Sequence, residues 1–231
     1  CRALQKQAKD VPGMKPHVTI EDMTLMDRLK SETSKAHADT EAIPFNACIM
    51  SGSMPQARYA GQLSCWHRLH VALEDALSAS TNARVQAVWQ DTTPRVPLLA
   101  LDLQWHPDAD VPGEAQQATS SMITWIESFA SSDPVRLLGV LYVLEGSTLG
   151  GMILRKSIAG MYGIEGDEGL AYYSAHGKEV MPNWMLFKAR MNSSITCSEE
   201  QDRIVDTACS TFEHVGHVLR GLSEGLHSQG D

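Results

Sequence analysis

Apolar side chains recur every three or four positions along most of the chain, and no alternating pattern persists for long. That period is typical of amphipathic helices, in which one face is buried. In residues 20–40 the stripe includes Leu25, Leu29 and Ala36. The pattern predicts helices at 20–40, 55–79, 115–130, 134–161, 182–193 and 199–226, and a weaker helix within 80–100 that is broken at Pro94 and Pro97.

The ends of the first helix are marked by its flanking residues. Thr19 followed by Asp22 resembles a capping box and predicts the start. Pro44 disfavours helical backbone in the residue before it and predicts an end by Ile43. Residues 1–18, which are polar, are predicted to form a loose N-terminal arm.

The remaining segments contain little that suggests a strand. Residues 104–116 are predicted to be a loop, and the glycine-rich residues 162–180 a connector with a short helix. Only Val96–Leu103 suggests a strand, and Pro97 argues against a central one. The prediction is an all-α fold with a single domain over residues 19–231.

Composition narrows the class of protein. Hydrophobic residues make up 43% and charged residues 20% of 231, as in ordinary globular proteins. The longest apolar stretches, such as Leu137–Leu144, are short for a bilayer, so no transmembrane segment is expected. The net charge of −9 excludes an overall basic footprint for nucleic acid, although a local basic rim for an anionic ligand stays open.

Cysteine usage points to a reducing compartment. The chain has five widely spaced cysteines and no Cys-x-x-Cys pair, which favours neither a zinc site nor a disulfide framework. We therefore expect a cytoplasmic protein.

Three glycines, Gly146, Gly150 and Gly151, interrupt a helix that is otherwise well patterned. Each is expected to cost about 1 kcal/mol relative to alanine in a helix interior. Gly146 and Gly150 share a face, which would let a flat ligand approach the backbone or let the helix bend. Taken alone, the spacing fits close packing of two helices better.

His37 lies near the end of the first predicted helix, on one face with Thr33 and Glu41. A neutral imidazole is the commonest metal ligand, and Glu41 could hold its second nitrogen. The alternative is a histidine stabilised by the helix dipole.

Five segments together resemble one known family, the heme oxygenases, and most closely its bacterial, biliverdin-producing members. The match runs in order through about residues 25–222. The segments are Leu29–Glu41 (a proximal-helix pattern Leu-Lys-x-x-Thr-x-x-x-His-x-x-x-Glu), Tyr59–Glu74, Tyr142–Gly151 (a distal-helix pattern), Phe187–Asn192 and Asp206–Phe212.

The resemblance implies a heme oxygenase-like multi-helix bundle that holds heme between a proximal and a distal helix. His37 is then the iron ligand. The catalytic positions implied on the distal side are Gly146, Ser147 and Gly150, and the heme-contacting positions are Lys30, Thr33, Glu41, Gly151, Lys188 and Phe212, with both lysines near the propionates and Phe212 lining the pocket.

The activity implied is oxidation of heme, which is both cofactor and substrate, by O₂ to biliverdin, CO and ferrous iron. An external donor such as ferredoxin or a flavoprotein reductase would supply electrons. Two positions depart from the family pattern. Ser147 stands where many members have an aspartate that organises proton delivery, and Trp184 where some have a basic residue. Serine holds water but is no carboxylate, so Thr148, Glu145 or backbone groups would have to substitute.

Other functions remain open on the residues alone. The first is a non-catalytic heme carrier on the same fold. The others are a thiaminase-like enzyme, a di-iron protein and a helical interaction module, although the paired Glu-x-x-His helices of di-iron proteins are missing. The histidine pairs His67/His70 and His214/His217 are interpreted mainly as surface or core residues.

Overall fold

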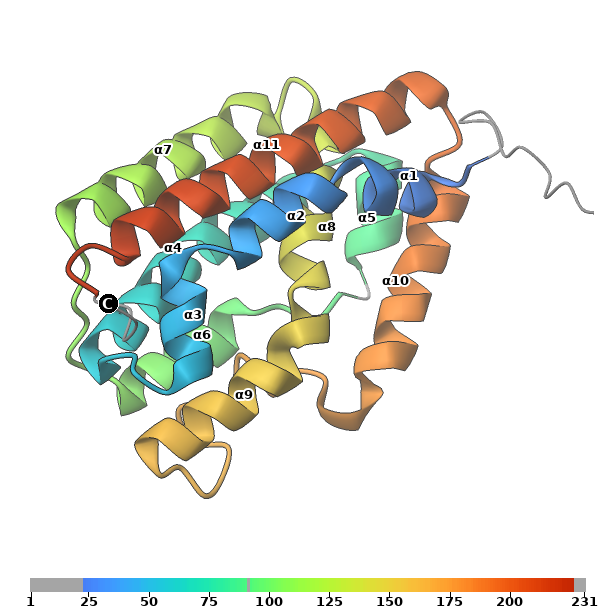
Figure 1. Ribbon diagram of the computed structural model, residues 1–231. Helices are drawn as coiled ribbons and strands as arrows, with labels where there is room; N and C mark the ends of the chain where they lie inside the picture. Colours follow the sequence, from blue (N-terminus) through green and yellow to red (C-terminus); the bar gives the residue numbers. More distant parts are fainter. Residues whose placement is uncertain (1–22, 91, 227–231) are drawn as a thin grey trace, which may run out of the picture.

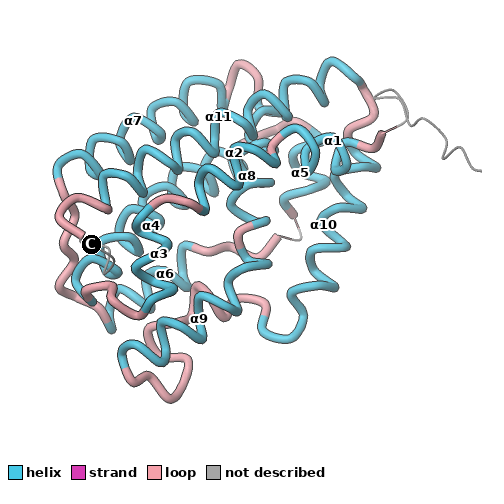
Figure 2. Tube along the Cα trace, in the orientation of Figure 1, coloured by secondary structure: helices cyan, strands magenta, loops and turns pink. Residues whose placement is uncertain are grey.

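The computed structural model describes residues 23–90 and 92–226 and confirms the all-α prediction. Within these ranges every regular element is helical, as Figure 2 shows. The predicted arm at 1–18 and the predicted cap at Thr19 and Asp22 lie outside the described residues.

The helices follow most of the predicted ranges. They are α1 Leu25–Glu32, α2 Ser34–Glu41, α3 Pro44–Ser51, α4 Gln56–Ala79, α5 Ala83–Trp89, α6 Val96–Trp105, α7 Gly113–Ala130, α8 Leu137–Gly146, α9 Thr148–Tyr162, α10 Val180–Ser194 and α11 Ser198–Leu222, with short 3₁₀ turns at Pro134–Arg136 and Gly177–Glu179.

The long helices α4, α7 and α11 form the framework. In Figure 1, α11 runs beside α7 with α2 next to it, and α8 and α9 cross below; α11 packs against α7, α8 and α2. The contact between α8 and α11 is close, since a Cβ at Gly139 would lie 2.5 Å from the Ile204 carbonyl oxygen. This glycine is therefore required for packing.

The prediction of one continuous first helix is wrong, because the chain bends at Thr33 between α1 and α2. The Thr33 hydroxyl donates a 2.7 Å hydrogen bond to the Leu29 carbonyl oxygen. Such back-bonding by threonine competes with the helical ladder and bends helices. His37 consequently lies on a separate short helix, α2.

Two prolines start helices where the sequence analysis expected interruptions. Pro97 lies in the first turn of α6 and Pro44 in that of α3, a helix that was not predicted. Proline is favoured there because its missing N–H would have no intrahelical partner. The start of α6 is also fixed by Glu74, whose Oε1 accepts hydrogen bonds from the backbone N–H groups of Arg95 (2.7 Å) and Val96 (3.2 Å).

The predicted helix 134–161 is divided at Ser147 into α8 and α9. The Ser147 hydroxyl donates to the Leu144 carbonyl oxygen (2.6 Å) and the Thr148 hydroxyl to the Glu145 carbonyl oxygen (2.7 Å). Two consecutive hydroxyls therefore compete with the backbone ladder at one point, next to Gly146. The glycine-bearing helix bends there.

By length and composition alone, the stretch Pro134–Tyr162 could cross a membrane, since it has 29 residues and a mean hydropathy of 1.6 in its most apolar window. The sequence analysis did not expect such a segment. Half of that window is buried inside the protein, as in a core helix.

A buried carboxylate holds the loop after α9 in place. Asp102 on α6 is fully buried and accepts hydrogen bonds from the backbone N–H groups of Ala171 (2.6 Å) and Tyr172 (2.8 Å). Burial raises the pKa of Asp102 to about 6, while these two bonds oppose the rise. Asp102 thereby fixes the segment that carries Tyr172, Tyr173 and His176.

This raised pKa predicts how stability depends on pH. A carboxyl whose pKa is higher in the folded than in the unfolded state stabilises the fold at low pH, and this contribution is lost as pH rises through the folded pKa. The stability of the wild type relative to Asp102→Asn should therefore fall between about pH 4 and 7. Urea unfolding of both proteins at several pH values measures it. A difference that stays constant or grows with pH would contradict the assignment.

Candidate functional site

His37 projects from α2 with more than half of its side chain, 56%, exposed to solvent. Its Nδ1 lies 3.4 Å from Glu41 Oε2, one turn later on the same helix. The edge of the ring faces Phe212 on α11, with the ring centroids 5.6 Å apart. Within the described residues Nε2 has no hydrogen-bond partner, so it is free to bind a ligand from outside.

The glycines of the bent helix differ from the packing glycine at position 139. A Cβ at Gly150 would meet no atom within 4 Å. A Cβ at Gly146 would lie 3.6 Å from the Trp184 ring, and one at Gly151 3.6 Å from Tyr173, which is ordinary contact. Packing of two helices therefore does not explain Gly150, and the backbone there is open to a ligand.

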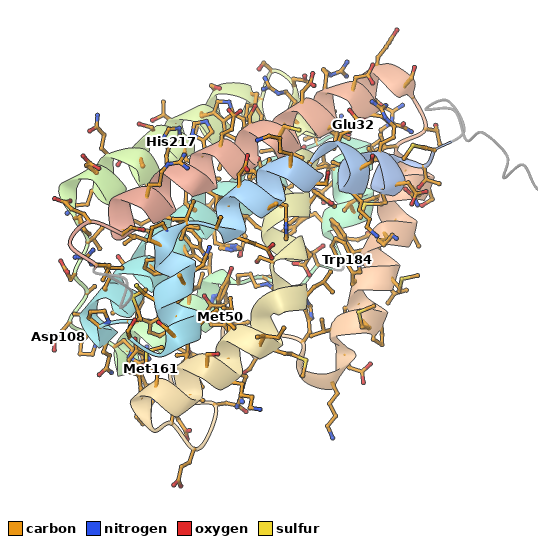
Figure 3. The ribbon with its side chains drawn as sticks, in the orientation of Figure 1. Glu32, Met50, Asp108, Met161, Trp184 and His217 are labelled. Carbon is orange, nitrogen blue, oxygen red and sulfur yellow. The ribbon has the colours of Figure 1, made fainter. Side chains whose placement is uncertain are left out.

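Large apolar side chains are exposed on the helices around this bend. Figure 3 shows Met50 on α3 and Trp184 on α10 on two sides of the junction between α8 and α9. A soluble protein rarely exposes many such side chains without a ligand or partner. Those more than a third exposed on these helices are Met50, Leu149, Met152, Ile153, Met181, Met185 and Leu186.

The two lysines lie on neighbouring helices, Lys30 on α1 and Lys188 on α10, and these helices pack together. Lys30 is exposed and Lys188 half-buried, and neither forms an ion pair with any described residue. Both remain available to an anionic group. Close by, Trp184 stacks on Phe187 with ring centroids 5.5 Å apart.

Like Gly151 and Phe212, Thr33 is a predicted site residue that the structure buries. It is 2% exposed and its hydroxyl is bonded to Leu29. Thr33 also lies near the Tyr142 hydroxyl, at the contact of the α1–α2 junction with α8. Thr33 is therefore placed to fix the α1–α2 junction relative to α8.

Sequence analysis missed a buried polar cluster directly behind the bend. Arg95 Nη2 donates to both carboxylate oxygens of Glu145 (3.0 and 2.8 Å), and His176 Nε2 lies 2.9 Å from Glu145 Oε1. Burial alone would raise the pKa of Glu145, but the bond with His176 and the charge of Arg95 outweigh it and lower this pKa. Glu145 was noted as a substitute for the missing aspartate, whereas no sequence signal connects it to Arg95 or His176.

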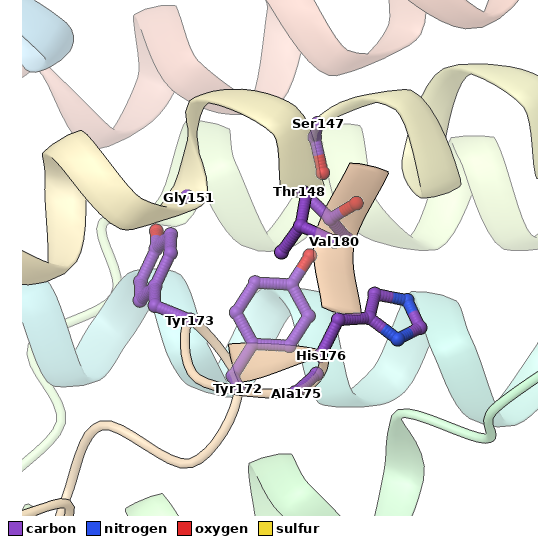
Figure 4. A pocket seen from close by; sticks show the side chains of 8 residues that line it. All are labelled: Ser147, Thr148, Gly151, Tyr172, Tyr173, Ala175, His176 and Val180. Carbon is purple, nitrogen blue, oxygen red and sulfur yellow. The ribbon is translucent and has the colours of Figure 1, made fainter. Parts of the chain in front are cut away.

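A small cavity of about 10 Å³ lies beside this cluster, against the turn between α8 and α9. Figure 4 shows the residues that line it, which include Ser147, Thr148, Gly151, Tyr172 and His176. A volume of roughly 10–15 Å³ is enough for one water molecule.

The described residues give no support to a di-iron site. Throughout residues 23–90 and 92–226, no three His, Cys, Asp or Glu side chains are grouped to hold a metal ion. His70, one of the paired histidines, is buried beside Glu74, and burial lowers its pKa. A metal bound at His37 would need its other ligands from a prosthetic group.

Comparisons with known proteins identify the family over most of the chain. The family model described as heme oxygenase matches residues 23–221. The heme oxygenase of Rhodella violacea is 24% identical over 158 residues, which are 67% of this chain and 67% of that protein.

Solved structures share the fold. A heme oxygenase from Leptospira interrogans superposes with a TM-score of 0.77 at 22% identity, covering 86% of this chain and 99% of that one. Heme oxygenase-2 of Synechocystis sp. PCC 6803, solved in complex with heme and NO, gives a TM-score of 0.80 at 20% identity over 87% and 86% of the two chains. The family match spans most of the sequence and includes His37 and the glycines of the bend, and the chain accordingly belongs to the heme oxygenase family of enzymes.

Proposed function

We propose that this protein binds heme between α2 and the bend of α8 and α9 and cleaves it with O₂ to biliverdin, CO and ferrous iron. The observation that carries the proposal is an exposed imidazole with a free Nε2 at His37, combined with an uncovered backbone at Gly150. The exposed apolar side chains of α3, α9 and α10 suit the apolar faces of a porphyrin.

The proximal side would be held by His37, with Nε2 toward the iron. Glu41, 3.4 Å from Nδ1, favours the tautomer that keeps its proton on Nδ1 and leaves Nε2 as the ligand. Phe212 limits rotation of the ring from the other side. When bound, heme supplies both the iron that reduces O₂ and the ring that is opened.

On the distal side the glycines Gly146, Gly150 and Gly151 provide space, and Ser147 provides a hydroxyl. A site without side chains leaves room for O₂ above the macrocycle. Lys30 and Lys188 would orient the propionates through charge-assisted contacts, each modest because of solvent. These contacts would decide which meso carbon faces O₂.

Electrons would come from an external donor of the ferredoxin or flavoprotein type, as the family resemblance implies. We also propose a cytoplasmic location, which suits the free thiols at Cys48, Cys65, Cys197 and Cys209.

Titration with hemin followed by reduction in air tests this function. We expect a Soret band on binding, and its loss together with growth of a broad verdin band when ascorbate or a ferredoxin system is added. A hemin complex that stays intact under these conditions would point to a heme carrier and would refute the catalytic proposal.

A further inference from the structure

Ser147 leaves the distal side without the carboxylate that many family members have, yet a polar side chain lies directly behind it. Tyr172, in the loop held by Asp102, is 5% exposed and lines the same small cavity as Ser147. In Figure 4 its hydroxyl points toward Ser147 and Thr148, across the small cavity. Tyr172 and Ser147 thus form a pair of hydroxyls that leads from the interior to the exposed turn.

Charged side chains surround Tyr172, the interior member of this pair. The groups that face Tyr172 are Arg95, Glu145 and Glu74, which all act on its charge, and the His70 ring, 5.8 Å away. Burial, as the largest influence, raises the pKa of Tyr172 to about 12, so the phenol keeps its proton at neutral pH. It therefore has a proton to donate in the direction in which its hydroxyl points, toward Ser147.

The charged cluster can hold its protons in two ways. His176 Nε2 lies 2.7 Å from Arg95 Nη2 and 2.9 Å from Glu145 Oε1, so it either accepts from Arg95 or donates to Glu145. In the second arrangement Nδ1 accepts from Asn183 Nδ2, 3.2 Å away, and the first arrangement needs the Asn183 amide turned so that its oxygen accepts from Nδ1. A proton can therefore move within the cluster while its members stay paired.

Two buried nitrogens of this region have no partner among the described residues. They are Arg95 Nη1 and His70 Nε2. A cluster that only stabilised the fold would be expected to satisfy its buried donors. Arg95 Nη1 is such an unsatisfied donor, and Arg95 bonds to His176, which lines the cavity of one-water size, as suits a site that binds and exchanges polar groups.

We propose that Tyr172 is a positioning residue for proton supply to the distal side, acting through Ser147 in place of the missing carboxylate. The inference rests on the proposed function. In each step the Ser147 hydroxyl, which otherwise donates to the Leu144 carbonyl oxygen, turns to give its proton to the distal side and takes one from the Tyr172 hydroxyl. Tyr172 takes its proton back through the cavity from His176, which Arg95 and Glu145 hold in place and which regains its proton from solvent.

Tyr172→Phe tests the proposal, because it removes one oxygen from a buried ring of the same shape. We expect hemin affinity to stay unchanged and verdin formation to slow on the order of 10-fold or more, since a positioned proton donor contributes roughly 100-fold to 10,000-fold and water partly substitutes. We also expect the pH midpoint of the alkaline spectral transition of the hemin complex, recorded without reductant, to move by roughly half a unit.

Tyr173→Phe is the matched control. Tyr173 lines the same cavity, but its hydroxyl donates to Gln62 Oε1 (3.3 Å) on α4, away from Ser147. This variant should keep the wild-type rate and midpoint. In the double variant Tyr172→Phe/Ser147→Asp, a carboxylate at the turn should restore verdin formation.

Equal losses in the two phenylalanine variants would overturn the proposal, because packing would then explain both. An unchanged rate and midpoint in Tyr172→Phe, or no recovery in the double variant, would also overturn it. If the wild type binds hemin and forms no verdin, the proposed function fails by itself. The pH midpoint of the alkaline spectral transition still tests the role of Tyr172 in that case. Equal midpoints in wild type and Tyr172→Phe would show that Tyr172 does not act on the distal side.

Discussion

Replacing His37 with alanine is expected to abolish verdin formation, with a loss on the order of 100-fold or more, because the protein then offers no nitrogen to the heme iron at this place. The fold should be unaffected, since the side chain is 56% exposed and its one polar contact is with Glu41 at 3.4 Å. Hemin titration and initial rates of verdin formation measure the effect. Added imidazole should restore part of the rate, because it can occupy the space that the side chain leaves.

His217→Ala provides the control for this experiment. His217 is also an exposed histidine, and it lies on α11 at the place labelled in Figure 3, away from the helix α9 that carries Gly150 (Figure 1). It should bind and convert hemin like the wild type. Unchanged turnover in His37→Ala would refute the assignment of the ligand.

Replacing Gly150 with phenylalanine is expected to reduce verdin formation by at least about 100-fold, because the ring would fill the space above the backbone where O₂ and the macrocycle have to fit. The apo protein should remain folded, since a Cβ at this position meets no atom within 4 Å. Verdin formation, hemin affinity and thermal unfolding of the apo protein are the measurements.

Gly160→Phe separates this steric effect from a general effect of phenylalanine in the helix. Gly160 lies on the same helix, α9, and is exposed, and a Cβ there would likewise meet no atom within 4 Å. Both variants gain helix propensity at an exposed site, so their apo stabilities should change alike. Turnover that is equally reduced, or equally normal, in both would contradict the placement of Gly150 over the heme.

Much of the helical framework follows from local pattern. The ranges of α4, α7, α10 and α11 agree closely with the apolar periodicity, because a helix buries one stripe whatever it packs against. The identification of His37 and the distal glycines depended on five short motifs in one order, each of which is local in the chain. The open backbone at Gly150 agrees with that interpretation.

The bends could not be predicted from periodicity. At Thr33 and Ser147 the apolar stripe continues, but a side-chain hydroxyl takes the place of part of the backbone ladder. Whether a threonine or serine does this depends on what packs around it. For the same reason Pro97, which suggests an interruption in the sequence, became the start of α6 once Glu74 accepted the free N–H groups.

The sequence by itself therefore determined the all-α class, the helices with a clear apolar stripe, and the residues that we expect to approach heme. Only the tertiary structure decided which polar groups stand behind the distal turn. Arg95, Glu145 and His176 come from segments 50 and 31 residues apart, and Tyr172 is placed by Asp102, 70 residues earlier. The charges of Arg95 and Glu145 are stable in the interior only because they are paired with each other. A pairing between segments so far apart in the sequence arises from packing of the whole chain and leaves no periodic pattern in the sequence.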